Sequence, residues 1–370
     1  MRVIQLLPEL NEGGVERGTV ELNREFIKQQ HESIVISQGG MLANTIENDG
    51  GRHVPFDVCS KNPLTAPSRI MGLRRLFNEL KPDLIHARSR VPAWLCHFAK
   101  RGLKLPLVTT VHGMNRINRY SRIMTTGDQV ICVSEIVRDY VAKGYDLDPQ
   151  RLTVVQRGTD MEYFAPAQVE QEWISTFRKE HGLENAWIVT GVGRVTWLKD
   201  YESLIQAAAL LKDEMPDLRL LIVGGVREDK QGYFTSLKKL AQEVGIEDRI
   251  RWAGNQTKMR EIYSLSDVLV NASLKMGNVG RTVVEALALD CPVLATRWEG
   301  LRTVVTDEVN GYNIETRNPE DLATKIRLIR ETNYTSIRES IPKEFKLDAM
   351  VENVLAVYRN LVSDSRGERK

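Results

Sequence analysis

The chain has 370 residues, of which 42% are apolar and 27% are charged, and its formal net charge is +2. This length exceeds what one hydrophobic core usually holds, so we expect two domains. The small net charge does not by itself indicate a nucleic-acid-binding protein, and no apolar run reaches membrane-spanning length. The first residues form a strand pattern without an apolar signal core, which predicts a cytoplasmic location.

The four cysteines, at positions 59, 96, 132 and 291, are widely spaced and contain no CxxC pair. Such spacing argues against a disulfide framework and against a metal site. We therefore expect no structural metal. No lysine-rich signature marks a pyridoxal phosphate site, and no bound cofactor is expected.

The first half alternates short apolar runs with longer amphipathic ones. Strands are predicted at 3–7, 33–37, 83–87, 106–111, 129–134 and 152–156. Helices are predicted at 15–30, 67–80, 91–100, 117–126 and 135–143. Because these strands are β-branched and apolar throughout, they predict a parallel sheet that is covered on both faces. We assign residues 1–165 to a Rossmann-like domain.

An unpatterned stretch at 164–171 could serve as a linker, and a second alternating series follows it. Its strands are predicted at 187–193, 218–225, 249–254, 268–273 and 292–296. Its helices are predicted at 201–211, 232–244, 259–264, 282–289 and 319–331. We assign residues 166–344 to a second Rossmann-like domain, and the final amphipathic helix, within 345–370, to the first. Doubly wound sheets bind ligands at the carboxyl ends of their strands, which predicts a site in the cleft between the domains.

The segment 268–296 reads as strand, glycine-bearing loop, apolar helix and strand. Glu285 is the one charged residue of that helix, and a buried carboxylate is costly unless donors reach it. Ligand hydroxyls could supply those donors, or Arg281 could, one turn earlier, as a purely structural ion pair. Gly277 and Gly280 would let a phosphate approach the backbone at the helix start.

Three further features follow predicted strands. Gly13 and Gly14 could face a ligand phosphate or form a plain tight turn, and they do not make a GxGxxG fingerprint. Arg194 and Lys199 share one loop and suit a diphosphate, although they could be ordinary surface cations. His112 ends a buried strand, where a lone histidine is more often structural than ligand-binding.

Basic residues gather between positions 69 and 125. This stretch contains twelve Lys or Arg residues and only two acidic residues, Glu79 and Asp83. It could be a solvated face, or it could bind an anionic partner such as phosphates, membrane lipid or nucleic acid. The cations are at 69, 74, 75, 81, 88, 90, 100, 101, 104, 116, 119 and 122.

Arg88 and Arg90 follow a buried strand and should emerge at its carboxyl end, beside the cleft. Arg116, Arg119 and Arg122 have a spacing that would gather them on one side of a helix.

Several motifs, in one order along the whole chain, together resemble glycosyltransferase family 4 of the GT-B fold. They are GGVERG, IHARSRVPAW, TTVHG, VICVSE, VVQRGTDMEYFAP, GVGRVTWLKD and GRTVVEALALDCPVLAT. The resemblance implies an α/β protein of two Rossmann-like doubly wound domains that face each other across a cleft. HARSRVPAW and RGTD are most similar to the bacterial branch that builds lipopolysaccharide core or related cell-surface glycans.

The resemblance also implies roles, position by position. Gly13 and Gly14 would face the donor phosphate and the acceptor, and His112 would touch the donor sugar. Arg194 and Lys199 would hold the diphosphate and stabilise the departing nucleotide. Glu285 would bind the ribose, while Gly280 and the amides near Arg281 and Thr282 would bind phosphate.

The chain departs from the family pattern at two positions. The first Glu of the family's Glu-x7-Glu motif is replaced by Gly277, so Lys275, Asn278 or a backbone group would have to contact the transferred sugar. Asp290 stands where the family usually has glycine. The first departure bears directly on which donor sugar the protein accepts.

Together these features predict a retaining, metal-independent glycosyltransferase that uses a nucleoside diphosphate sugar as its donor. The resemblance implies front-face displacement, in which no side chain acts as a nucleophile. The predicted acceptor is an anionic glycan or glycolipid at Arg88, Arg90 and Arg119, with peripheral contact at the inner membrane and no nucleic acid. A noncatalytic nucleotide-sugar-binding protein, or another GT-B enzyme such as an epimerase or a phosphorylase, is the alternative.

Overall fold

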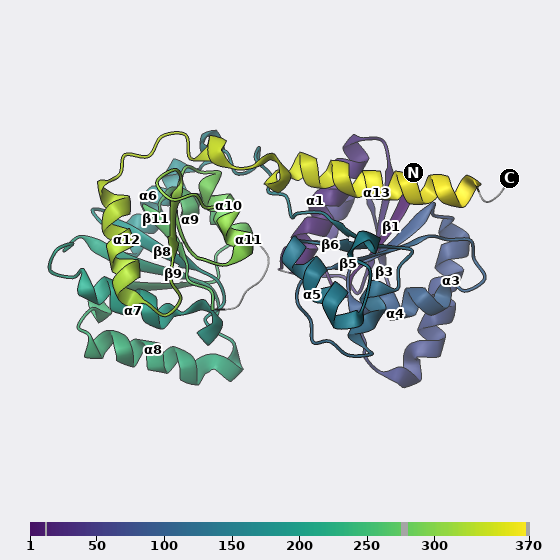
Figure 1. Ribbon diagram of the computed structural model, residues 1–370, viewed down its shortest axis with the longest axis horizontal. Coiled ribbons are helices and arrows are strands. Elements are labelled where there is room, and N and C mark those ends of the chain that lie inside the picture. The colour runs from purple at the N-terminus through teal and green to yellow at the C-terminus, as the bar shows by residue number, and fades with distance from the viewer. Residues whose placement is uncertain (12, 275–279, 368–370) are drawn as a thin grey trace. The chain divides into compact units, whose positions relative to one another are not determined.

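In a computed structural model the chain is described over residues 1–11, 13–274 and 280–367, and it divides into two compact units. Unit 1 comprises Met1–Gly158 together with Glu344–Lys370, and unit 2 comprises Thr159–Lys343. Within the described residues each unit is built on a parallel β-sheet with helices between successive strands (Figure 1). The predicted fold class, α/β with two Rossmann-like doubly wound domains, is confirmed.

The sheet of unit 1 has the strand order β3-β2-β1-β4-β5-β6-β7, and neighbouring strands are parallel. The order reverses beside β1, and in open parallel sheets such a switch point creates a crevice at the carboxyl ends of the strands. Its strands are β1 (Arg2–Leu6), β2 (Glu32–Ser37), β3 (Arg52–Pro55), β4 (Leu84–Ala87), β5 (Leu107–Val111), β6 (Gln129–Cys132) and β7 (Leu152–Val154). Its α-helices are α1 (Gly14–Lys28), α2 (Ala43–Asn48), α3 (Ala66–Leu80), α4 (Arg90–Ala99), α5 (Glu135–Tyr145) and α13 (Leu347–Gly367).

Alternate side chains of these strands fill two separate cores, as the period of two along a strand requires. Ile4 and Ile85 pack with side chains of α3, α4 and α5, whereas Val3 and Leu84 pack with side chains of α1 and α13. In Figure 1 the final helix, drawn in yellow, runs beside α1. Because α13 supplies buried side chains to this sheet, the carboxyl-terminal segment belongs to unit 1.

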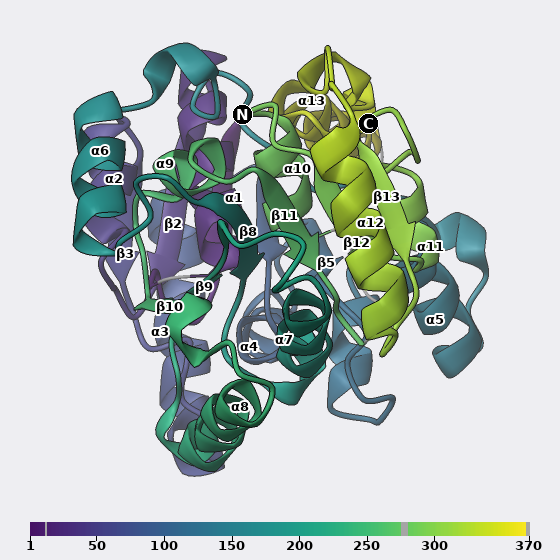
Figure 2. The same cartoon turned by 90° about the vertical axis from the view of Figure 1, so that its left-hand side faces the viewer.

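The sheet of unit 2 has the order β10-β9-β8-β11-β12-β13. Helices α7, α8 and α12 share one of its cores and α6 and α9 share the other, and α12 lies beside α7 in Figure 2. Its strands are β8 (Trp187–Val192), β9 (Leu218–Val223), β10 (Ile250–Gly254), β11 (Val268–Asn271), β12 (Val293–Thr296) and β13 (Gly311–Ile314). Its α-helices are α6 (Gln171–Glu180), α7 (Tyr201–Leu210), α8 (Gln231–Glu243), α9 (Met259–Ser264), α10 (Arg281–Leu287), α11 (Glu299–Arg302) and α12 (Pro319–Glu331).

The chain leaves unit 1 at Gly158, earlier than the boundary at 165/166 that the sequence predicts. Phe164 is buried in unit 2, with its ring 6.2 Å from that of Tyr263. Arg338 of the same unit donates to the carbonyl oxygens of Met161 and Phe164. These contacts hold the start of the proposed linker against unit 2, and a short 3-10 turn follows at Pro166–Gln168. The return to unit 1 falls at 343/344, against a predicted 344/345.

The helix predicted at 117–126 is wrong. Only Ser121–Thr125 is helical there, as a 3-10 turn. The Asn118 side chain accepts a hydrogen bond from the Ser121 amide (2.8 Å), and the Tyr145 hydroxyl donates to the Asn118 carbonyl (3.1 Å). The Asn118 bond to the amide three residues later is typical of a helix N-cap, so the helical turn begins only after Asn118.

Candidate functional site

The carboxyl edge of the sheet in unit 2 brings Lys199 together with the end of β11. Lys199 Nζ donates to Ser273 Oγ (3.4 Å), which in turn donates to Asn271 Oδ1 (2.7 Å). No ion pair joins Lys199 to a carboxylate in the described part of the chain. Burial lowers the pKa of Lys199, and nearby Arg194 lowers it further. A partly buried cation that lacks a counter-charge is suited to an anionic ligand.

Glycines at the strand ends make room for Lys199. Gly193 has φ 141°, and a Cβ there would lie 2.5 Å from Cε of Lys199. Gly224, with φ 152°, packs against Gly193 so closely that a Cβ would lie 2.0 Å from its carbonyl oxygen. The Tyr201 hydroxyl donates to that same oxygen (2.7 Å). A side chain at Gly193 would therefore displace the Lys199 side chain, and one at Gly224 would clash with the backbone of the loop that carries Lys199.

Arg194 and Trp197 are the exposed members of this loop. The Arg194 side chain faces solvent, and Trp197 is 54% exposed. The structure therefore brings Arg194 and Lys199 into one loop at the end of β8, as predicted from the sequence. Their action on a diphosphate stays a prediction.

Glu285 is buried in α10 and both of its carboxylate oxygens have protein donors. Arg281 Nε donates to Oε1 (3.1 Å), and the Tyr263 hydroxyl donates to Oε2 (2.9 Å). The structural ion pair that the sequence allows is therefore formed, and Tyr263 is an additional donor that the sequence did not indicate. Since each carboxylate oxygen can accept more than one hydrogen bond, ribose binding by Glu285 stays a prediction.

The start of α10 contains the remaining residues predicted in unit 2. Gly280 is the N-cap, and a Cβ on it would lie 3.0 Å from Nδ2 of Asn271, while Arg281 and Thr282 open the helix. Asn278, Gly277 and Lys275 lie outside the described residues. Because α10 has only seven residues, its dipole is small, and the argument for anion binding rests on Arg194 and Lys199.

Asp290 follows α10 with φ 56°, a left-handed conformation that glycine adopts without strain. Its side chain accepts a hydrogen bond from the Arg338 amide (3.0 Å). This backbone geometry accounts for the glycine usual at this position, and aspartate is among the residues that tolerate it.

In unit 1, Gly13 is the N-cap of α1 and Gly14 is its first residue. Gly13 has φ 162°, an extended conformation open to any residue, so backbone strain does not require glycine there. A Cβ would lie 2.1 Å from a carboxylate oxygen of Glu16, the end of a flexible side chain. Contact of this pair with a ligand stays a prediction.

His112 follows β5 and is held by an arginine that sequence reasoning missed. One Nη2 group of Arg157 lies 3.2 Å from Nδ1 of His112 and donates to its carbonyl oxygen (3.3 Å). Burial lowers the pKa of His112 well below the usual value, and Arg88, Arg157 and His86 lower it further. His112 is therefore neutral at physiological pH.

Arg88 follows the carboxyl end of β4 directly, as expected, and it is buried, with only 6% of its surface exposed. Its Nη1 donates to Gln5 Oε1 (3.2 Å), and its Nε has no hydrogen-bond partner among the described residues. Burial lowers the pKa of Arg88 to about 10, an effect that Tyr358, Glu21 and Glu16 partly oppose. The cause of this burial is the packing of α1 and α13 over the sheet, which the sequence of β4 alone does not show.

A buried polar layer lies beside Arg88. His86 Nδ1 is 2.5 Å from the hydroxyl of Tyr358 in α13, and His86 Nε2 is 2.6 Å from Thr110 Oγ1. Sequence reasoning missed His86 and Gln5. The available signal was a polar residue inside each of two apolar runs, His86 in LIHA and Gln5 in the VIQL part of β1.

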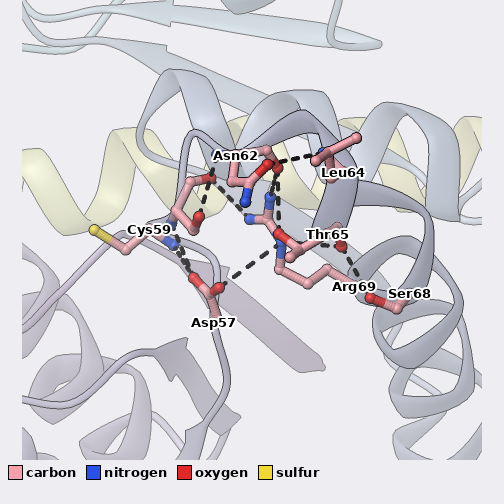
Figure 3. A network of polar contacts seen from close by, with 8 residues as sticks. Asp57, Cys59, Asn62, Leu64, Thr65, Ser68 and Arg69 are labelled. Atoms are coloured by element: carbon pink, nitrogen blue, oxygen red, sulfur yellow. Dashed lines mark hydrogen bonds and ion pairs between the residues drawn. The ribbon is translucent and has the colours of Figure 1, made fainter.

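Several cations of the 69–125 stretch are structural. Arg69 is buried and donates to the carbonyls of Ser60, Asn62 and Thr65, which fixes the loop that follows β3 (Figure 3). Arg74 donates to the carbonyls of Ala99 and Arg101. These interactions remove part of the apparent charge excess from the surface.

Other cations of the stretch are less buried: Arg90 is half-buried, and three further arginines are exposed. Arg90 donates to Ser121 Oγ (3.4 Å) and lies over the Tyr120 ring, 5.4 Å from its centroid. Arg119 is exposed, as are Arg116 and Arg122. Because no helix spans 117–126, the helical clustering predicted for the last three is wrong.

The described residues contain no helix that is long and apolar enough to cross a membrane. They also contain no group of three or more His, Cys, Asp or Glu side chains placed to hold a metal ion.

Family models cover most of the chain. Residues 12–163 match the model described as Glycosyltransferase Family 4, and residues 174–344 match the model described as Glycosyl transferases group 1.

Curated relatives are identical to this chain at about one residue in four. A D-inositol 3-phosphate glycosyltransferase of Salinispora tropica is 27% identical, over 77% of this chain and 65% of the relative. The chain thus spans slightly under two thirds of that protein. A protein of the same name from Mycolicibacterium vanbaalenii is 26% identical, over 100% of this chain and 86% of the relative.

Solved structures show the same fold. A glycosyltransferase from Rickettsia africae superposes with a TM-score of 0.87 at 26% identity, covering 98% of each chain. WaaG, described as a glycosyltransferase involved in lipopolysaccharide biosynthesis, superposes with a TM-score of 0.67 at 15% identity and the same coverage. Anabaena HepE in complex with UDP-glucose superposes at 0.82 and 19% identity, covering 98% of this chain and all of that one. The last two likenesses concern the fold alone.

Proposed function

The chain belongs to glycosyltransferase family 4, and on this premise we propose that it is a retaining enzyme acting on a nucleoside diphosphate sugar. The sugar, a hexose or a heptose, passes to a lipopolysaccharide-core or related cell-surface glycan or glycolipid. The reaction takes place on the cytoplasmic side, with peripheral contact at the membrane. It needs no metal and no cofactor, because protein cations take the part of a metal toward the diphosphate.

The observation that carries this proposal is Lys199, a partly buried cation without a carboxylate partner among the described residues. Its one hydrogen bond within the described part of the chain, to Ser273 Oγ, is long at 3.4 Å, so the ammonium can turn to a better acceptor. Arg194 adds a guanidinium on the same loop, and a guanidinium binds phosphate oxygens in pairs. Together they favour the charge that develops on a departing diphosphate.

A front-face displacement fits the carboxylates of this edge. Asp200 is buried and accepts hydrogen bonds from the Ser203 hydroxyl (2.8 Å) and the Arg317 amide (3.1 Å), while Glu285 is held by Arg281 and Tyr263. Carboxylates held in this way are poor nucleophiles, which supports a mechanism without a covalent enzyme intermediate. The bond from the anomeric carbon to the diphosphate breaks, the acceptor oxygen forms its bond on the same face, and its proton passes to a phosphate oxygen.

The acceptor is proposed to be anionic and to bind unit 1. Relatives named D-inositol 3-phosphate glycosyltransferases act, by that name, on a phosphorylated acceptor. Arg88 supplies a buried guanidinium for such a group, Arg90 a half-buried one and Arg119 an exposed one. Exposed cations also favour an anionic membrane surface.

The test begins with a thermal-unfolding panel of UDP, GDP, ADP and their sugars on the full chain. A true ligand at a hundred times its dissociation constant stabilises the fold by about 2.7 kcal/mol. The stabilising donor is then incubated with lipopolysaccharide-core oligosaccharides and with inositol 3-phosphate, and the anomeric configuration of the product is read by NMR.

The outcomes separate the alternatives. Transfer with the donor's anomeric configuration supports the proposal, and the opposite anomer refutes the retaining mechanism. Binding without transfer or hydrolysis indicates a noncatalytic nucleotide-sugar-binding protein. A changed sugar without any acceptor indicates an epimerase.

A further inference from the structure

The contact between Arg157 and His112 determines which imidazole nitrogen carries the proton. A guanidinium is protonated at all relevant pH values and has donors but no acceptor. Its Nη2 lies 3.2 Å from Nδ1 of His112, so Nδ1 must offer a lone pair at this contact. In a neutral imidazole the single proton then resides on Nε2.

We propose that Arg157 is a positioning residue that holds His112 in the Nε2–H tautomer, so that His112 meets the substrate as a hydrogen-bond donor and not as a base. The proposal rests on the proposed function in one respect, namely that the substrate reaches His112. The tautomer itself can be measured without any substrate.

The surroundings of His112 keep the ring neutral. Among the described residues, the groups that lower its pKa electrostatically are Arg88 after β4, Arg157 after β7 and His86 within β4. Burial and these two guanidinium groups together lower the pKa of His112. A second proton, on Nδ1, would also have to displace the donor group of Arg157.

This arrangement restricts what His112 can recognise. A ring that donates through Nε2 requires an oxygen with a free lone pair on the substrate. The charges of Arg88 and Arg157 favour a negatively charged oxygen, such as that of a carboxylate or a phosphate, over a hydroxyl. The expected ligand at this position is therefore an acidic group of the donor sugar or of the acceptor.

The test uses the full chain labelled with ¹⁵N-histidine, of which it has six residues. Loss of one set of ring signals in His112→Asn identifies His112. In the wild type at neutral pH we expect an unprotonated Nδ1 and a protonated Nε2. In Arg157→Met we expect a population protonated at Nδ1, and a rise in the pKa of His112, because one of the cations that lower it is removed.

Arg157→Lys restores a charged donor and should restore the wild-type ring signals. Arg151→Met is the matched control, because Arg151 is an exposed arginine that precedes β7 and should leave the His112 signals unchanged. Retained dispersion of the backbone amide spectrum shows that each variant folds.

Kinetics provide the second measurement. In Arg157→Met, kcat/KM should fall on the order of tenfold or more, because the donor is present in only part of the population. The acid limb of its pH profile should move to higher pH together with the His112 pKa.

A wild-type ring protonated at Nδ1, or an Arg157→Met ring identical to the wild type, would overturn the proposal. If the ring behaves as stated while no nucleotide sugar is ever consumed, the proposed function fails and the tautomer assignment stands.

Discussion

Replacement of Lys199 by methionine separates a ligand-binding cation from a structural one. Methionine keeps most of the side-chain length and removes the charge. Two unit charges about 4 Å apart interact by about 4 kcal/mol at an effective dielectric constant near 20. Because Lys199 is partly exposed, solvent screening reduces this value, and we expect a loss of about 2 to 4 kcal/mol in diphosphate binding. That corresponds to a fall of about 30- to 1000-fold in affinity.

The same substitution should leave the free energy of unfolding unchanged or higher. Burial has already lowered the pKa of Lys199, which means that the folded state disfavours its charge. Removal of the ammonium removes that cost, and the only interaction lost among the described residues is a long hydrogen bond to Ser273. If Lys199 stabilised the fold, the substitution would lower the free energy of unfolding.

Isothermal titration with the stabilising nucleoside diphosphate measures the affinity, and urea unfolding measures the free energy of unfolding. Lys212→Met is the matched control, since Lys212 lies in the same unit and donates to the Val244 carbonyl (3.4 Å) at the end of α8. The reasoning is refuted if Lys199→Met binds within twofold of the wild type, or if Lys212→Met loses as much affinity.

Three further outcomes are expected. Glu285→Gln should lower stability by about 1 to 3 kcal/mol, because the amide replaces an acceptor of Arg281 by a donor; unchanged urea midpoints would contradict this. Burial lowers the pKa of His86, so as pH falls below about 6.5 the unfolded chain binds a proton before the folded chain does. The free energy of unfolding should then drop by up to about 1.4 kcal/mol per pH unit until the pKa of the folded state is reached. In urea unfolding, His86→Gln should show a weaker loss of stability at acid pH. Arg119→Ala should raise the acceptor KM and weaken its dependence on salt, with donor hydrolysis intact, and an identical salt profile would make Arg119 a solvated surface residue.

The sheet strands were predictable because their signal is local. Runs such as VIQLL and LIHA contain the apolar residues that a strand needs when both its faces are covered, and the helices between them have periodic apolar positions. The short elements α2, β3, α11 and β13 lacked a pattern long enough to identify them, and α6 was missed beside the presumed linker. The predicted helix at 117–126 failed because side-chain hydrogen bonds of Asn118 and Tyr145 are not visible in an apolar period.

The site was predictable only where it follows strand ends. Arg194, Lys199 and His112 could be placed because parallel strands bring their carboxyl ends to one edge. Arg157 could not, since it lies beyond β7 and reaches a residue 45 positions away. Tyr358 of α13 is 272 positions from His86, and its role depends on the return of the chain to unit 1.

Burial would favour an anionic ligand in the same way at the proposed sites of both units. In unit 1, Arg88 and Arg157 approach a neutral His112, and in unit 2, Arg194 approaches a Lys199 whose pKa is lowered. In both cases cations lie at the end of a parallel sheet, and burial lowers the pKa of a group beside them. Such a group has already lost part of its hydration, so an arriving anion replaces missing interactions and does not have to displace strongly bound water. Exposed cations such as Arg119 keep their hydration, which is why salt should affect them more strongly than Lys199.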